Sequence, residues 1–322
     1  MTHFTRRQVL AATLALAAST GVHAQAFPSK PIRIIVGYSP GGAVDIIARA
    51  VGQHLQASLG QPVIVDNKPG AGTNIATKSL IDSAPDGHTL MLAANALAAN
   101  VSLFQPAPYA LDRTTPIALV GRVPVVLAAN AQSPVNSIKA LIAQSKAKPE
   151  SINYGTPGNG STPHLAVELF QRAAGIGLSH VPYKGGAPAM NDVIAGHIQT
   201  VAVNALEVLP HVRVGKLRVL AVLSDKRSPI FPDAPTIAES GFPGFEASVW
   251  YAVVGPAGMP PAVVTRLHQE VQRALAAPEV RERLASAGGD VVPGSTAMLA
   301  DMLRREQQRY EKLIREAQIK PD

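Results

Sequence analysis

Three residues of types that could form a hydrolytic triad lie beside glycine-rich turns of this chain. Ser161 and His164 follow P-G-N-G, and Asp45 follows S-P-G-G. A serine nucleophile needs a histidine that reaches its hydroxyl and an acid that orients the histidine. Ser161 and His164 would share one turn of a helix start, which leaves His164 no evident orienting acid, and we expect no G-x-S-x-G nucleophile elbow in the chain. We therefore expect no enzyme, and a secreted hydrolase using Ser161 and His164 stays an alternative.

Anion binding fits the two turns better than catalysis. Each turn follows a strand-like run and opens a helix, so its backbone N–H groups gather at the positive end of the helix dipole. Such a pair holds a carboxylate without lysine or arginine, and neither turn matches a nucleotide-binding pattern. The candidate ligand-binding residues in the turns are Tyr38, Ser39, Gly41, Gly42, Ala43, Val44, Asp45, Gly158, Asn159, Gly160, Ser161, Thr162 and His164.

Each turn also has a purely structural interpretation, as a connector between a strand and a helix. Asp45 would then be a first-turn acid that stabilises its own helix, and this role is favoured because a direct contact would repel an anionic ligand. His164 would brace its loop. Two matched turns in corresponding positions favour the binding interpretation.

Strand and helix signals alternate along the chain and form two α/β units of similar size. Apolar strands at 122–129 and 248–254 mark the junctions. This predicts an α/β fold of two lobes, each lobe a mostly parallel sheet flanked by helices, with two crossover strands. The C-terminal helices would return to the first lobe, and the lobes could close on a ligand.

Export is predicted by the first 26 residues. Arg6 and Arg7 precede a short apolar run and small-residue cleavage sites, which is typical of a cleavable signal peptide of the general secretory or twin-arginine route. Removing them lowers the formal charge from +7 to +5, since 7 − 2 = 5. The remaining basic residues are scattered, so we expect no nucleic-acid partner. The chain has no cysteine, and its histidines lack metal-ligand spacing, so we expect no metal and no cofactor.

The motifs resemble those of a known family over essentially the whole mature chain. They include Y-S-P-G-G-A-V-D (38–45), V-I-V-D-N-K-P-G-A-G (63–72), I-N-Y-G-T-P-G-N-G-S-T-P-H-L (152–165) and V-P-Y-K-G-G-A-P-A (181–189). The chain resembles the Bug family, the extracytoplasmic solute receptors of tripartite tricarboxylate transporters. The resemblance implies a two-lobed periplasmic binding protein (type II-like). It also implies that both turns grip a ligand carboxylate, and that Asn95, Lys184 and Asn204 complete the pocket.

The resemblance also implies the domains and partners. The expected organisation is a signal peptide (1–26), a first lobe (27–124 and 250–322) and a second lobe (125–249). The expected protein is a periplasmic monomer that passes a small carboxylate to the permease subunits, or signals to a membrane partner as the alternative. Asn204 stands where many members carry aspartate, which favours a plain acid over an amino acid. The ligand itself is left open.

Overall fold

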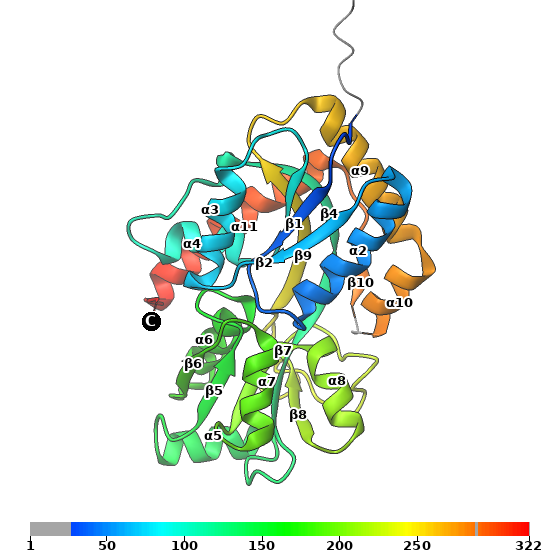
Figure 1. Ribbon diagram of the computed structural model, residues 1–322. Coiled ribbons are helices and arrows are strands. Elements are labelled where there is room, and N and C mark those ends of the chain that lie inside the picture. The colour runs from blue at the N-terminus through cyan, green and yellow to red at the C-terminus, as the bar shows by residue number, and fades with distance from the viewer. Residues whose placement is uncertain (1–26, 287–288, 322) are drawn as a thin grey trace, which may run out of the picture.

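The structure is a computed structural model, and it describes residues 27–286 and 289–321. Figure 1 shows two lobes, one above the other, with strands that run from one into the other. The predicted signal peptide lies outside the described residues. Among the helices of the described ranges, none combines the length and hydropathy needed to cross a membrane.

The first lobe is built on three parallel strands in the order β2-β1-β3. The middle strand β1 is the apolar run I-R-I-I-V, and four of its five residues are buried, because helices cover both faces of the sheet. The strands are β1 (Ile32–Val36), β2 (Val63–Asn67) and β3 (Thr89–Ala93), and β10 (Asp290–Val291) pairs with β4. The helices are α2 (Ala43–Leu59), η1 (Ala71–Thr73), α3 (Asn74–Ile81), α4 (Ala96–Leu103), η2 (Leu111–Arg113), α9 (Pro261–Ala276), α10 (Pro278–Ser286) and α11 (Thr296–Ala317).

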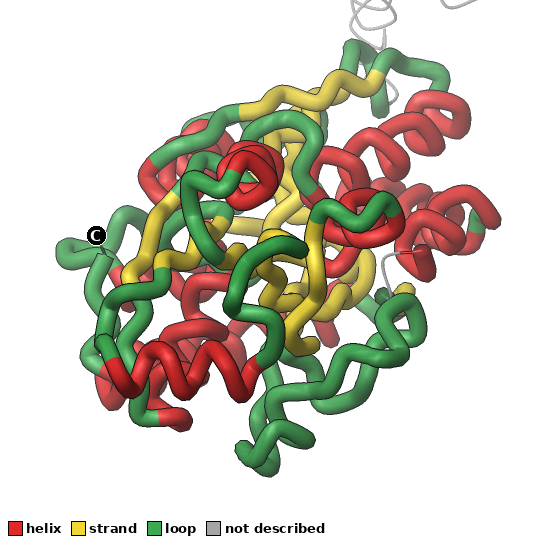
Figure 2. The backbone as a smooth tube through the Cα atoms, turned by 90° about the horizontal axis from the view of Figure 1, so that it is seen from below, coloured by secondary structure: helices red, strands yellow, loops and turns green. Residues whose placement is uncertain are grey.

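The second lobe repeats this plan with the parallel strands β6-β5-β7. Figure 2, which views the molecule from below, shows the strands inside and helices on either side of them. The strands are β5 (Asn153–Thr156), β6 (Ser179–Pro182), β7 (Thr200–Asn204) and β8 (Leu217–Val222). The helices are α5 (Ile138–Ala147), α6 (Thr162–Ala174), α7 (Gly186–Ala195) and α8 (Ala205–Arg213).

Two long strands, β4 (Thr114–Asn130) and β9 (Ser248–Pro256), occupy the predicted crossover positions. β4 pairs antiparallel with β9 as far as Pro124, and from Val125 it pairs antiparallel with β7. The strand therefore changes its partners between these two residues. We propose that the lobes divide here, at the boundary that the sequence predicts.

The predicted strand 122–129 is too short, since β4 begins eight residues earlier, at Thr114. The missed half contains Pro116 and Gly121, which normally argue against a strand interior. The pairing of β4 with β9 shifts register between Pro116 and Ala118 and between Leu119 and Gly121. These irregularities accommodate the proline and the glycine without ending the strand.

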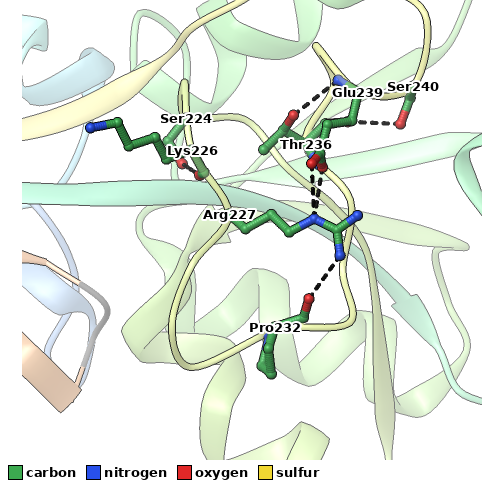
Figure 3. A network of polar contacts seen from close by, with 7 residues as sticks. All are labelled: Ser224, Lys226, Arg227, Pro232, Thr236, Glu239 and Ser240. Carbon is green, nitrogen blue, oxygen red and sulfur yellow. Dashed lines mark hydrogen bonds and ion pairs between the residues drawn. The ribbon is translucent and has the colours of Figure 1, made fainter.

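A long segment without helices connects β8 to β9 and returns the chain to the first lobe. Figure 3 shows how Arg227 holds this segment together. Its Nε donates to both carboxylate oxygens of Glu239, at 3.0 and 2.9 Å, and its Nη1 donates to the carbonyl of Pro232 at 3.0 Å. Thr236 and Glu239 exchange two further hydrogen bonds. These contacts give the return segment a defined path.

Candidate functional site

The start of α2 in the first lobe and the start of α6 in the second lobe meet in one pocket between the lobes. This pocket, called the cleft pocket below, has a volume of about 20 Å³. That is room for about one water molecule, so a larger guest requires the lining residues to rearrange. The lining residues are Tyr38, Gly42, Ala43, Val44, Ala94, Pro157, Ser161, Thr162, Pro163, Gly186, Asn204, Glu207 and Val249.

Only part of the predicted set lines the cleft pocket. Residues predicted from the sequence that do so are Tyr38, Gly42, Ala43, Val44, Ser161, Thr162 and Asn204. Predicted residues that lie outside its lining are Ser39, Gly41, Asp45, Asn95, Gly158, Asn159, Gly160, His164 and Lys184. The second group belongs largely to the same two turns, and the contacts below indicate that these residues hold the turns in place.

Asp45 stabilises the first turn from inside the first lobe. Its carboxylate accepts hydrogen bonds from the Gly41 N–H (3.0 Å), from the Asn67 amide (3.0 Å) and from two nitrogens of Arg49 (both 2.9 Å). Burial acts to raise the pKa of Asp45, but the hydrogen bonds from Arg49, Gly41 and Asn67 outweigh it and lower the pKa. These contacts favour the helix-stabilising role of Asp45 over ligand contact.

The side-chain amide of Asn95 also makes hydrogen bonds within the protein. Its Oδ1 accepts the Trp250 N–H at 3.0 Å, and its Nδ2 donates to the carbonyl of Ser248 (3.3 Å) and the hydroxyl of Tyr310 (2.8 Å). It therefore joins the end of β3 to β9 and α11. Any contact of Asn95 with a ligand stays a prediction.

The second turn is braced by its own side chains. Ser161 caps α6, because its Oγ accepts the His164 N–H at 3.4 Å. The Nδ1 of His164 accepts the Gly160 N–H at 3.2 Å, and its ring stacks on His180 with centroids 4.2 Å apart. Burial lowers the pKa of His180 to about 4, so the imidazole below the turn is neutral at physiological pH.

These contacts do not form a serine–histidine pair, because Ser161 meets the backbone of His164 and not its ring nitrogen Nδ1. A G-x-S-x-G pattern does occur once, at Gly37 to Gly41 around Ser39, and the sequence interpretation overlooked it. The hydroxyl of Ser39 donates to the backbone carbonyl of Lys184 at 2.8 Å. The Ser39 hydroxyl is therefore part of a contact between the lobes.

The lobes touch where the two turns approach each other. Ser39 donates both its N–H and its hydroxyl to the carbonyl of Lys184, each at 2.8 Å, whereas the side chain of Lys184 is exposed. Gly160, with φ +71°, lies so close to Asn100 and Leu103 of the first lobe that a Cβ would clash with both side chains. The backbone of each turn therefore lies directly against the other lobe.

Glu207 is the charged one among the six lining residues that sequence reasoning missed. It lies in the first turn of α8, and Asn204-x-x-Glu207 has the spacing of a helix capping box. That spacing explains the residue locally, so nothing in the sequence points into the pocket. Its Oε1 accepts the Asn204 amide at 3.0 Å, and Gly186 packs so closely on its carboxylate that a Cβ there would clash.

The environment of Glu207 spans the two lobes. Burial raises the pKa of its carboxyl, and hydrogen bonds from Asn204 and from the backbone of Ala43, at the start of α2, only partly oppose this. Beyond burial, its charge raises the pKa of the Tyr38 and Tyr251 hydroxyls. The cleft pocket thus combines two helix starts that favour anions with one buried acid.

Comparisons with known proteins agree with this architecture. A sequence model described as "Tripartite tricarboxylate transporter family receptor" matches residues 47–319. Protein BugT of Bordetella pertussis is 40% identical over 315 residues, covering 97% of this chain and 96% of BugT.

Two solved structures extend the comparison. The periplasmic binding protein BugD is 31% identical with a TM-score of 0.88, over 92% of this chain and 100% of BugD. MatC from Rhodopseudomonas palustris, solved with bound malate, is 30% identical with a TM-score of 0.85, over 89% of this chain and 100% of MatC. The predicted two-lobed fold and the predicted family are both confirmed, and the family is one of solute-binding receptors and not of enzymes. The chain therefore belongs to the receptor family of the tripartite tricarboxylate transporters.

Proposed function

We propose that this receptor binds a small carboxylated molecule in the periplasm, in the cleft pocket, and delivers it to the membrane subunits of a tripartite tricarboxylate transporter. The supporting observation is the meeting of two helix starts, at Gly42 and Ser161, from different lobes in one pocket. Backbone N–H groups at both starts would bind the carboxylate, and no basic side chain in the described part of the chain lines the pocket. The malate bound by MatC is a dicarboxylate and agrees with this chemistry.

Closure follows from the position of the two turns. A carboxylate held by both turns has more contacts when the lobes are together, so it favours the closed form. The contact of Ser39 with Lys184 would then form or tighten on closure. The closed surface would be the one that the transporter recognises. Cleavage after residue 26 would release the mature chain into the periplasm.

The test is a binding measurement with Gly42→Val. Gly42 lines the cleft pocket and has an ordinary φ of −78°, so a valine should fold but should crowd the carboxylate position. We expect at least a 100-fold loss of affinity by isothermal titration calorimetry. Gly294→Val before α11, where φ is not positive and a Cβ would meet only Met298 at ordinary contact distances of 3.6–3.8 Å, controls for the loss of a glycine. Normal binding by Gly42→Val would contradict the proposed site.

A further inference from the structure

Among the residues that the structure describes, Glu207 is a buried acid without a cationic partner. Glu207 is 9% exposed, and its Oε2 has no hydrogen-bond partner within the same residues. In the part of the chain that the structure describes, no lysine, arginine or histidine contributes to the shift of its pKa. Buried charges in proteins are normally paired, because an unpaired charge is costly to remove from water. The side-chain amide of Asn204 accounts for Oε1, and no hydrogen bond within the described residues accounts for Oε2.

A second acceptor atom in the same pocket is also unpartnered. Asn204 is 6% exposed, and its Oδ1 has no hydrogen-bond partner within 27–286 and 289–321, while its Nδ2 donates to Glu207. Both side chains line the cleft pocket together with the starts of α2 and α6. The pocket thus offers two buried acceptor oxygens beside groups that bind anions. A ligand that satisfies both must carry a donor as well as a carboxylate.

We propose that the ligand carries a protonated amino group that binds Glu207 Oε2 and Asn204 Oδ1, while its carboxylate binds the helix starts at Gly42 and Ser161. The ligand class is therefore an amino acid-type zwitterion. This proposal rests on the proposed function and narrows its substrate class. The asparagine at position 204 favoured a plain acid, because it removes a negative charge suited to an amino group. Glu207 supplies that negative charge from one turn further along the chain, so the preference is reversed.

The electrostatics of the pocket agree with this assignment. A second carboxylate in so small a space repels Glu207, whereas an ammonium group compensates it. Burial already raises the pKa of Glu207, so a cation beside it would relieve a cost that the folded protein carries. A zwitterion can place its carboxylate at the helix starts and its ammonium group beside Glu207 at the same time.

Matched pairs of acids test the proposal. The probes are succinate and aspartate, glutarate and glutamate, adipate and 2-aminoadipate, and 3-phenylpropionate and phenylalanine. Each pair differs only by the amino group. Malate is a further probe, because it carries a hydroxyl at the carbon that bears the amino group in aspartate. Titration calorimetry of the refolded mature protein should show that the aminated member of at least one pair binds about 100-fold more tightly than its partner.

Glu207→Gln is the decisive variant. It should weaken binding of the aminated acid at least tenfold and leave the plain acid unchanged or tighter, because the like charge is gone. Glu207→Asp keeps the charge and should retain part of the selectivity. Glu282→Gln, an exposed acid on α10, makes the same charge change outside the pocket and should alter neither affinity.

The outcomes separate the two proposals. If a plain acid binds as tightly as its aminated partner, or if Glu207→Gln does not change the affinity for the aminated acid, the zwitterion proposal is overturned and the carboxylate receptor stands. If no acid of either kind binds to protein shown to be refolded, the proposed function fails and this inference fails with it.

Discussion

The Oε1 atom of Glu207 lies 3.0 Å from the side-chain amide nitrogen of Asn204, and both residues line the pocket between the lobes. The same pair lies at the start of α8 and forms one wall of the cleft pocket. Changes at Glu207 should therefore affect the stability and the ligand affinity in different ways, and each effect can be measured separately.

Removing the charge of Glu207 should change how stability depends on pH. Burial raises its pKa in the folded protein, so the favourable contribution is fully present below the unfolded-state pKa and is lost as pH rises through the folded-state pKa. Glu207→Gln should therefore be more stable than the wild type at pH 8, by about 1–3 kcal/mol, and should lose this advantage near pH 4. Urea unfolding at both pH values measures the difference. An equal difference in the free energy of unfolding between variant and wild type at both pH values would contradict the raised pKa of Glu207.

Asp45 should show the opposite dependence on pH. Its pKa is lowered in the folded protein, so its contribution is present above the unfolded-state pKa and is lost as pH falls through the folded-state value. Asp45→Asn should reduce the free energy of unfolding at pH 7 by about 1 kcal/mol, with little change in ligand affinity. A tenfold or greater loss of affinity with unchanged stability would assign Asp45 to the ligand.

Gly160 should be required for closure of the lobes. An alanine there would clash with Asn100 and Leu103 of the first lobe, so Gly160→Ala should weaken ligand binding at least tenfold. Gly175→Ala is a matched control, since its φ of +60° imposes a similar backbone cost of about 1 kcal/mol. Both variants should lose similar stability in thermal unfolding, and only Gly160→Ala should lose affinity. Equal affinity of the two variants would argue against close approach of the turn to the first lobe.

The hydroxyl of Ser39 should contribute a small part of the stability of the closed form. Ser39→Ala removes its hydrogen bond to the Lys184 carbonyl but keeps the bond from the backbone N–H. We expect a two- to tenfold loss of affinity, corresponding to about 0.5–1.5 kcal/mol, with a faster dissociation rate in stopped-flow measurements. Ser58→Ala removes a hydroxyl contact within α2 alone and should leave affinity unchanged. An unaltered dissociation rate in Ser39→Ala would remove this contact from the closing mechanism.

Much of the fold could be predicted from local sequence patterns. The sequence predicts helices at 186–195, 205–213 and 261–276, and the structure has helices with these bounds. Their apolar spacing and terminal glycine or proline residues are local signals. Helix α4 was not predicted. Its sequence A-L-A-A-N-V-S-L is largely apolar and buried, so it carries no amphipathic pattern.

The site was harder to predict than the fold, because its key contact is tertiary. The turns at Gly42 and Ser161 follow strand ends, and this local arrangement indicated the anion site. Glu207 appears in the sequence only as a capping acid, and its place beside Ala43 depends on the packing of one lobe against the other. Sequence patterns within one helix contain no information about that packing.

The central claim, a carboxylate receptor, is tested most directly by a thermal-shift screen of the mature protein after unfolding and refolding to remove carried ligand. The panel contains aliphatic dicarboxylates, citrate-like acids, aromatic carboxylates and amino acids. At about 100 times Kd, a ligand of the native state adds about 2.7 kcal/mol, which should raise Tm by several degrees. We predict such a shift for one class of these acids. A flat panel, with refolding verified by circular dichroism, would contradict the account.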